Sequence, residues 1–350
     1  MSMDVEDDEQ ARAPHGRPAM SDVGRLAGVS HQTVSRVING SRHVSPQTRD
    51  RVMAAMQELG YRPNSVARAL ATGRTQTIGV VSFDTTLFGP ASTLFGIERA
   101  AHEAGYFITV SSLKALDRGS VLHAIERLRG QGVDGVLVIV SEQESAEALL
   151  HAPLDVPLVA VEAGPELGIP VVAVDQQKGA ELATRHLLDL GHRTVHHIAG
   201  PLGSIESQQR AGGWRATLEA AGAPRPEPLI GDWTARAGYH LARRLIRDRS
   251  VSAVFVSNDQ MALGVLRALH EAGRRVPEEI SVVGFDDVPE SSYFTPPLTT
   301  VRQDFGEVGS RSLRVLVRAI NSVASGARPP DGSLVSPELV VRASSGAPSL

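Results

Sequence analysis

From Thr77 onward the chain alternates short apolar runs with segments of helical periodicity, and this alternation restricts the possible folds more than any other feature. Strands that alternate with helices form parallel sheets, with helices packed on their faces. We therefore expect an α/β body over residues 76–341, built from two successive series of strands and helices. The apolar runs occupy residues 78–81, 107–110, 136–140, 194–198, 253–256 and 281–285.

Polar side chains stand where several of these strands end. Ligands of open α/β sheets bind beyond the carboxyl ends of the strands. Glu162, Asn258 and Asp286 lie at such ends, and Arg210 and Trp233 lie on nearby elements. Carboxylates, amides and guanidinium groups can hydrogen-bond to sugar hydroxyls, and an indole can pack on a sugar ring. A sugar-binding cleft is one interpretation. The other is that these Asp and Asn residues cap the helices that follow them.

The N-terminal part has the pattern of three short helices, and we assign residues 20–62 to a separate domain. Ser21 is the expected cap of the first helix, which directs Val23, Leu26 and Ala27 inward before it ends at Gly28. The second helix follows Ser30 after a three-residue turn, and the third begins at Ser45-Pro46 and stops at Gly60. Two short helices around such a turn predict a helix-turn-helix.

The second helix combines an apolar face with a hydrogen-bonding face. Val34, Val37 and Ile38 share the apolar side, which leaves Gln32 and Arg36 among the exposed polar residues. Glutamine can pair with adenine and arginine with guanine in the major groove. Residues 20–75 hold eight arginines against three acidic residues, a net charge of +5, which favours a polyanionic partner. The alternative for this segment is an ordinary amphipathic hairpin with a solvated basic surface.

The remaining segments are assigned by composition and length. Residues 1–18 are acidic and contain proline, and we expect a disordered arm. Residues 63–75 form a hinge and linker, because the stretch from Asn64 to Ala71 is too short to hold a helix alone in water. Residues 342–350 are expected to be a flexible tail.

The motifs together resemble the LacI/GalR family from Val23 to about Val341. The head carries AGVSHQTVSRVING, SPQTRDRVMAAMQELGYRPN and SVARALA, and the body carries QRAGGW, GDW, SNDQMALGVLRAL, ISVVGFDD and PPLTTVRQDF. The resemblance implies a helix-turn-helix head on a periplasmic-binding-protein-like body of two doubly wound α/β subdomains. It also implies a transcriptional repressor whose partners are palindromic double-stranded operator DNA and a small carbohydrate effector bound in the cleft.

Carried over by position, the resemblance implies the DNA-binding residues. Three of them would reach base edges: His31, Gln32 and Arg36. Seven would position the DNA backbone: Ser30, Thr33, Ser35, Asn39, Ser45, Thr48 and Tyr61. In the hinge, Leu70 would wedge between central base pairs, supported by Asn64 and Ala67.

The same transfer implies eight effector-binding residues: Leu87, Pro90, Glu162, Arg210, Trp233, Asn258, Asp286 and Phe305. Arg210, Asn258 and Asp286 would bind hydroxyls, and Trp233 and Phe305 would pack the ring. Phe83, Glu162 and Glu206 depart from the serine, aspartate and serine that the resemblance implies at those positions. A galactoside or other glycoside is favoured, and whether it acts as inducer or corepressor stays open.

Other classes of protein find little support in the sequence. The chain contains no cysteine, no Gly-x-Ser-x-Gly, no phosphate-binding loop motif and no His-Glu-x-x-His, so we expect no enzyme, no cofactor and no metal. The start lacks a signal-peptide pattern and no apolar run approaches about 18 residues, so we expect a cytoplasmic protein. A transport-type solute-binding protein or a sugar-binding module is the alternative, but neither accounts for the basic head.

Residues 338–350 hold no leucine heptad of the kind that joins dimers into tetramers, and a homodimer is predicted.

Overall fold

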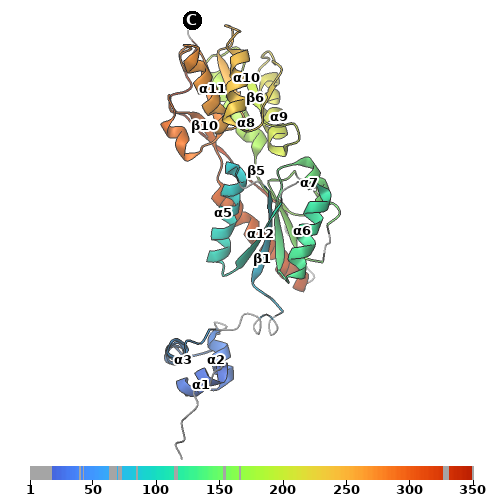
Figure 1. Ribbon diagram of the computed structural model, residues 1–350, viewed down its shortest axis with the longest axis vertical. Coiled ribbons are helices and arrows are strands. Elements are labelled where there is room, and N and C mark those ends of the chain that lie inside the picture. The colour runs from blue at the N-terminus through green and yellow to red at the C-terminus, as the bar shows by residue number, and fades with distance from the viewer. Residues whose placement is uncertain are drawn as a thin grey trace, which may run out of the picture. The chain divides into compact units, whose positions relative to one another are not determined.

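The computed structural model divides the chain into two compact units, residues 1–75 and residues 76–350 (Figure 1). It describes residues 18–38, 41, 43–62, 69, 73–83, 86–113, 117–152, 155–164, 167–325 and 331–348. The predicted arm, with the exception of Pro18, and most of the predicted hinge lie outside these ranges.

The first unit is a three-helix head with its own small core. Val23, Val34 and Val52 are fully buried against one another, with Tyr61 packed at the edge. Ser45 caps the third helix by accepting a hydrogen bond from Thr48 N at 3.3 Å. The helices are α1 (Met20–Ala27), α2 (His31–Ile38) and α3 (Pro46–Glu58).

Two details of the first helix differ from the prediction. The helix begins at Met20 with Ala19 at its N-cap, so the cap assigned to Ser21 is wrong. The carboxylate of Asp22 accepts a hydrogen bond from Ala19 N at 2.8 Å instead. Leu26 is 46% exposed rather than inward, because a helix of two turns buries only the narrow stripe that faces its two neighbours.

The second unit contains two six-stranded sheets, each with helices on both faces. In the first sheet the order is β11-β5-β4-β3-β1-β2, and every pair is parallel. Side chains of its central strand alternate between two cores: Leu137 packs beneath α5 and α12, and Val138 beneath α6 and α7. Figure 1 shows α5 and α6 on opposite sides of this sheet. The elements are β1 (Thr77–Phe83), α5 (Phe88–Glu103), β2 (Phe107–Leu113), α6 (Arg118–Gly130), β3 (Gly135–Ile139), α7 (Gln143–Leu149), β4 (Leu158–Val161), β5 (Val171–Val174), α12 (Phe305–Ser325) and β11 (Ser333–Val335).

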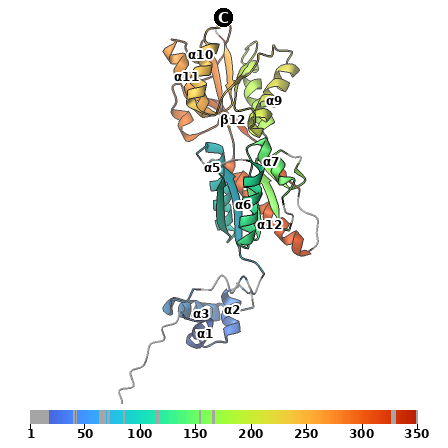
Figure 2. The same cartoon turned by 45° about the vertical axis from the view of Figure 1, so that its right-hand side comes forward.

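The second sheet has the order β12-β10-β9-β8-β6-β7, in which only β12 runs antiparallel to its neighbour. Leu187 and Trp214 belong to the core beneath α8 and α9, and Met261 and Leu266 to the core beneath α10 and α11. Figure 2 shows α10 and α11 on one side of this sheet and α9 on the other. The elements are α8 (Gln176–Asp189), β6 (His196–Ala199), α9 (Ile205–Ala220), β7 (Leu229–Ile230), α10 (Ala235–Leu245), β8 (Ala253–Val256), α11 (Asp259–Glu271), β9 (Ser281–Asp286), η2 (Pro289–Tyr293), β10 (Thr299–Arg302) and β12 (Glu338–Val340).

The chain passes between the two sheets three times. It leaves the first sheet after β5, returns after β10 and leaves again after β11. The two subdomains are therefore discontinuous in sequence, and three short crossings join them. Gln176 and Gln303 stand at the first two crossings.

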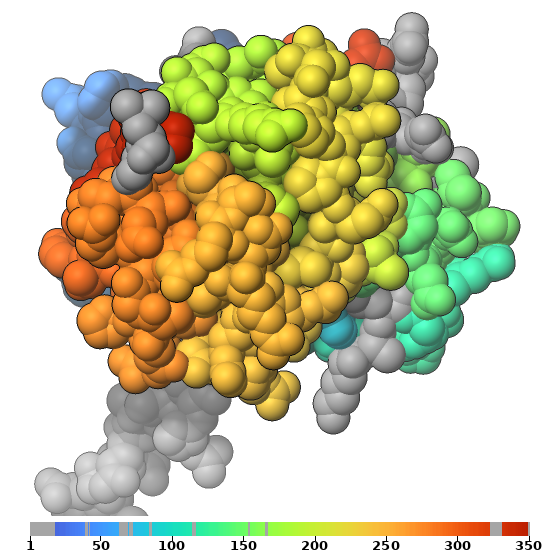
Figure 3. Space-filling view, turned by 90° about the horizontal axis from the view of Figure 1, so that it is seen from above, coloured from blue at the N-terminus to red at the C-terminus, as the bar shows by residue number. Residues whose placement is uncertain are grey.

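Residues 342–346 do not form the flexible tail that their composition predicts. Ser344 is fully buried, where its hydroxyl donates to Val282 O at 2.6 Å and accepts from Thr299 N at 2.7 Å. His192 contacts Gly346 O through Nε2 at 3.0 Å. In Figure 3 the red C-terminal residues lie beside lime-green and orange segments of the second subdomain. Small and polar residues favour disorder, whereas hydrogen bonds to β9 and β10 fix this segment.

Within the residues that the structure describes, no helix combines the length and the apolar character needed to cross a membrane.

Helices α10 and α11 approach so closely that glycine is required at their crossing. A Cβ added at Gly264 would lie 1.9 Å from Ala235 O, and one added at Gly238 would lie 2.1 Å from Met261 O. We expect Gly264→Ala to cost about 1–3 kcal/mol, because backbone atoms cannot move aside as a side chain would. Differential scanning calorimetry should show a melting temperature several degrees lower. The control is Gly130→Ala, where no atom lies within 4 Å of the added Cβ, and equal melting temperatures for the two variants would contradict the prediction.

Candidate functional site

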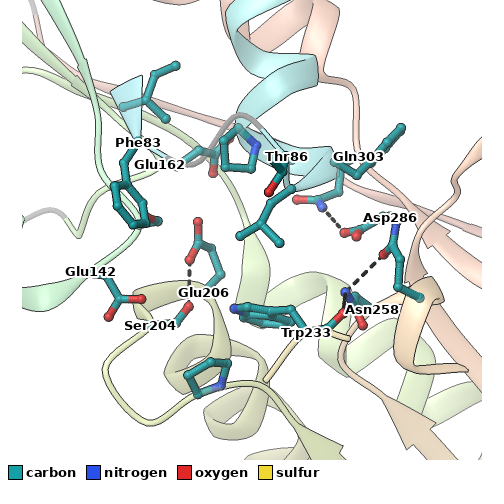
Figure 4. A pocket seen from close by; sticks show the side chains of 18 of the residues that line it. Phe83, Thr86, Glu142, Glu162, Ser204, Glu206, Trp233, Asn258, Asp286 and Gln303 are labelled. Atoms are coloured by element: carbon teal, nitrogen blue, oxygen red, sulfur yellow. Dashed lines mark hydrogen bonds between the residues drawn. The ribbon is translucent and has the colours of Figure 1, made fainter. Parts of the chain in front are cut away.

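A pocket of about 410 Å³ lies between the two subdomains, and the polar side chains that line it come mainly from the carboxyl ends of strands in both sheets (Figure 4). This is the position where open α/β sheets bind ligands. The lining residues are Phe83, Thr86, Leu87, Phe88, Gly89, Pro90, Ile139, Ser141, Glu142, Glu162, Gln176, Pro201, Ser204, Glu206, Arg210, Asp232, Trp233, Thr234, Asn258, Gln260, Asp286, Gln303 and Phe305.

All eight residues predicted to contact an effector line this one pocket. The first subdomain contributes four of them and the second subdomain the other four. They are Leu87, Pro90, Glu162 and Phe305 from the first, and Arg210, Trp233, Asn258 and Asp286 from the second. The structure therefore brings the predicted set together, although the members are spread over more than 200 positions of sequence.

A closed ring of four side chains forms the polar floor of the pocket. Arg210 Nε donates to Gln176 Oε1 at 2.8 Å, and Gln176 Nε2 donates to Gln303 Oε1 at 2.9 Å. Gln303 Nε2 donates to Asp286 Oδ1 at 2.6 Å, and Arg210 Nη1 lies 3.7 Å from that same oxygen. Arg210 Nη1 also donates to Ser257 O. The ring connects Arg210 and Asp286 to both of the crossings at which Gln176 and Gln303 stand.

Burial shifts the pKa values of the charged pair in this ring. Removal from water raises the pKa of Asp286 to about 6, although the charge of Arg210 opposes the shift. Burial also lowers the pKa of Arg210, with Asp286 opposing. The guanidinium lies 3.8 Å above the ring of Phe285, which holds its plane in place. A hydroxyl-bearing ligand would meet a fixed donor and a fixed acceptor here.

Aromatic side chains form the walls of the pocket. The six-membered ring of Trp233 packs against Gly200, where an added Cβ would come within 2.3 Å of the indole. Phe305 and Phe88 meet edge to face with their ring centroids 5.8 Å apart. Rings of this kind can cover the apolar C–H face of a sugar.

Asn258 supports both interpretations of the strand-end residues. Its Oδ1 accepts from Met261 N at 2.9 Å and so caps α11, as the helix-cap interpretation predicts. Its Nδ2 donates to Trp233 O and to Gln260 Oε1, each at 3.0 Å, and the residue lines the pocket. The cap and these two bonds fix the side chain in position, so a ligand that accepts from this amide must replace one of them.

The pocket is built on strained backbone. Glu162, Trp233 and Asp286 have φ angles of 62°, 72° and 114°, in the region that favours glycine. Such conformations cost about 1–3 kcal/mol each and are concentrated at functional sites. All three residues line the pocket, so the strain positions the side chains that face it.

Three carboxylates gather at the other end of the pocket: Glu142, Glu162 and Glu206. Burial is the main cause that raises the pKa of Glu162 and that of Glu206 to about 7, and their mutual repulsion raises that of Glu162 further. Burial also raises the pKa of Glu142. Sequence reasoning did not select Glu142, Gln176 or Gln303 as site residues. All three follow strands, so applying the strand-end rule to β3, β5 and β10 would have found them.

The head presents the predicted DNA-reading residues on its surface. His31, Gln32 and Arg36 are exposed on α2, opposite the buried Val34 and Val37. Among the residues predicted to contact the DNA backbone, the hydroxyls of Ser30 and Ser45 serve as helix caps, Thr33, Ser35 and Thr48 are half-buried, and Tyr61 packs on the core. The predicted contacts Asn39, Asn64, Ala67 and Leu70 lie outside the described residues.

No group of three or more His, Asp or Glu side chains suited to a metal ion occurs among the described residues. His196 and His197 occupy β6, where His197 is buried and its Nδ1 lies 3.0 Å from Phe255 O. Burial lowers the pKa of His197 to about 4, so this ring is a neutral core residue at physiological pH.

Comparison with known proteins places the chain in one family. Residues 19–64 match the family model "Bacterial regulatory proteins, lacI family", and residues 184–345 match the model "Periplasmic binding protein-like domain". The lactose operon repressor of Escherichia coli (strain K12) is 36% identical over 299 residues, which cover 85% of this chain and 83% of that protein. The HTH-type transcriptional regulator CelR of Thermobifida fusca is 39% identical over 321 residues, covering 87% of this chain and 92% of that protein.

Solved structures agree with this placement. The lac repressor dimer bound to operator and the anti-inducer ONPF matches with a TM-score of 0.81 and 34% identity, covering 95% of this chain and 100% of that chain. The complex of the transcriptional regulator CelR with cellobiose matches with a TM-score of 0.67 and 35% identity, covering 94% and 100%. The predicted fold class and family resemblance are confirmed: the chain belongs to the lacI family of bacterial regulatory proteins.

Proposed function

We propose that this protein represses transcription from a palindromic operator and is controlled by a sugar that binds in the pocket between the subdomains. Two observations carry the proposal: both subdomains contribute to the set of eight pocket residues, and the head exposes His31, Gln32 and Arg36. Because the partner is chromosomal DNA, we place the protein in the cytoplasm. The named relatives are transcriptional repressors or regulators rather than enzymes.

The chemistry of the side chains that line the pocket supports a glycoside as the ligand. Arg210 and Asp286 offer a donor and an acceptor fixed within one hydrogen-bond ring, which suits vicinal hydroxyls. Trp233 and Phe305 offer apolar surface for the ring of the sugar. Relatives with solved structures bind ONPF and cellobiose, which supports a sugar without specifying which one.

The bound ligand controls the arrangement of the subdomains through the crossings that join them. Gln176 and Gln303 hydrogen-bond to the two charged residues of the pocket and stand at two of the three crossings. A ligand that binds to Arg210 and Asp286 and displaces them would move both crossings through these hydrogen bonds. The arrangement of the subdomains would change as a result. Operator DNA and sugar then affect each other's affinity by the same factor, as linkage requires.

The test is a gel-shift titration of the full chain on a palindromic probe taken from upstream of its own gene, repeated with galactose, galactosides, glucose, cellobiose and ribose. We expect tight, sequence-dependent binding that one sugar weakens or strengthens. Sugar binding without preference for any duplex would favour a sugar-binding module, and equal sugar affinity with and without operator would contradict the coupling.

The exposed glutamine of α2 provides a test of base recognition. We expect Gln32→Ala to weaken binding to the preferred operator by about 1–3 kcal/mol and to relax the preference at one base pair, because the amide would lose its paired contacts. Fluorescence anisotropy on a set of single-base operator variants measures both effects. The control is Gln57→Ala on α3, an exposed glutamine outside the recognition helix. Equal losses on every sequence would assign Gln32 to the DNA backbone instead.

The chain is proposed to act as a homodimer, since two heads are needed to read a palindrome. Sedimentation velocity at micromolar concentration should show a single dimeric species. A stable tetramer under the same conditions would contradict the assignment.

A further inference from the structure

The described residues that line the pocket include five carboxylates and one cationic side chain. Arg210 is the only Lys or Arg among the described residues that line the pocket, and its ion pair is with Asp286. The charge of Arg210 also acts on Glu162 and Glu206 and lowers the pKa of each, but burial outweighs it. In Figure 4 Glu142, Glu162 and Glu206 lie toward the left of the view and Asp286 toward the right.

Glu162 lines the pocket, and its two carboxylate oxygens differ in their hydrogen bonding. The residue is 7% exposed, and its Oε2 accepts from Val174 N at 3.2 Å. Its Oε1 is buried and makes no hydrogen bond of ordinary geometry within the described part of the chain, although the nearby amide of Gln176 lowers the pKa of this carboxyl. An unpaired buried carboxylate oxygen is costly, and the positive φ of this residue adds to the cost. A ligand that supplies a donor would remove the first of these costs.

Glu142 lies at the N-cap of α7 and Glu206 in the first turn of α9, and the segments around them join across the subdomain boundary. Gln143 N donates to Gly203 O at 3.2 Å, and Ile205 N donates to Ser141 O at 3.1 Å. Glu142 Oε2 lies against Gly203, where an added Cβ would come within 2.6 Å of that oxygen.

Glu206 is oriented by the adjacent cap residue. Ser204 Oγ donates to Glu206 Oε2 at 2.8 Å. The two glutamates of the first subdomain, Glu142 and Glu162, thus share the end of the pocket with a glutamate of the second. A positive group between them would attract both subdomains.

We propose that the ligand is an amino sugar whose protonated amine lies against Glu142, Glu162 and Glu206 while its hydroxyls meet Arg210 and Asp286. This inference rests on the proposed function and specifies its ligand. A primary ammonium carries three N–H donors, which matches three carboxylates better than a hydroxyl does. The pKa values of about 7 for Glu162 and Glu206 agree, because a bound cation would stabilise the ionised forms.

Isothermal titration calorimetry of the full chain at pH 7.5 tests the proposal with matched sugars. The probes are galactosamine and glucosamine, their uncharged parents galactose and glucose, and the N-acetylated forms, in which the amine carries no charge. We expect at least one amino sugar to bind about tenfold or more tightly than both its parent and its N-acetylated form.

Substitution of the pocket glutamates tests where the amine of the sugar lies within the pocket. Glu162→Gln and Glu206→Gln should each weaken binding of the amino sugar by about tenfold more than they weaken binding of its parent sugar. The control is Glu219→Gln, an exposed glutamate further along α9. Circular dichroism establishes that each variant is folded.

The outcomes separate this inference from the function on which it rests. A neutral sugar that binds as tightly as its amine, or an amino sugar that binds both variants like the wild type, would overturn the inference and leave the sugar-controlled repressor in place. If no sugar bound while operator binding persisted, both the amino sugar and the sugar effector would be wrong.

Discussion

Replacing Arg210 with methionine should weaken binding of the controlling sugar by about 100-fold or more and abolish its effect on the operator complex. Arg210 is 5% exposed and donates to Gln176 and Ser257 beside Asp286. Methionine fills much of the same space but supplies no donor. The ligand would lose its charged partner, and Asp286 would keep only the hydrogen bond from Gln303. Breaking a buried pair of this kind costs about 2–5 kcal/mol in binding.

Two comparisons separate this loss from general unfolding. Arg215→Met changes an exposed arginine on the same helix and should leave the sugar response unchanged. Arg210→Lys retains the charge but not the forked geometry, so we expect an intermediate affinity. Calorimetry with the sugar that acts on the wild type, and gel shifts with and without it, provide the measurements. A normal response in the folded Arg210→Met variant would remove Arg210 from the site.

Replacing Glu162 with glutamine should raise the melting temperature at pH 8 by several degrees, up to about 6 °C, with little change at pH 4.5. Burial raises the pKa of Glu162 from its ordinary 4.5 to about 7 in the folded protein, with repulsion from Glu206 as the next cause. The unfolded chain therefore releases this proton at lower pH than the folded chain does. Stability falls as pH rises from about 4.5 to about 7, and the total is about 3 kcal/mol. Glutamine has no proton to release and removes this loss.

The comparison must be made as a difference between variant and wild type. His197, whose pKa burial lowers to about 4, acts in the opposite sense, because the unfolded chain binds its proton first as pH falls. That contribution is common to both proteins and cancels. Scanning calorimetry from pH 4.5 to pH 8 gives the difference curve, and Glu219→Gln is the exposed control. A difference that did not change with pH would show that Glu162 ionises normally in the folded protein.

The elements of the fold were predictable because their signals are local. Ser45-Pro46 starts α3 and Gly28 ends α1 through the conformations of single residues, and the apolar runs mark the strands of both sheets. The errors arose where packing overrides the local signal. Leu26 fits the helical stripe but finds no neighbour to cover it, and Ser344 is small and polar but completes the hydrogen bonds of β9 and β10.

The residues of the candidate site also divide into a group that local sequence signals identify and a group that only the packing identifies. The residue types that end the strands can be read along the chain, and this was enough to select Glu162, Asn258 and Asp286, while the family motifs added Arg210 and Trp233.

The contacts among the site residues depend on the packing of the two subdomains. Gln176 hydrogen-bonds to Arg210 across 34 residues of sequence and to Gln303 across 127, and Glu142 lines the same pocket as Glu206 at the subdomain boundary. Strand and helix signals act over a few residues, so they carry no information about partners this far apart. These contacts exist because two separately folded sheets face each other and are joined by three crossings.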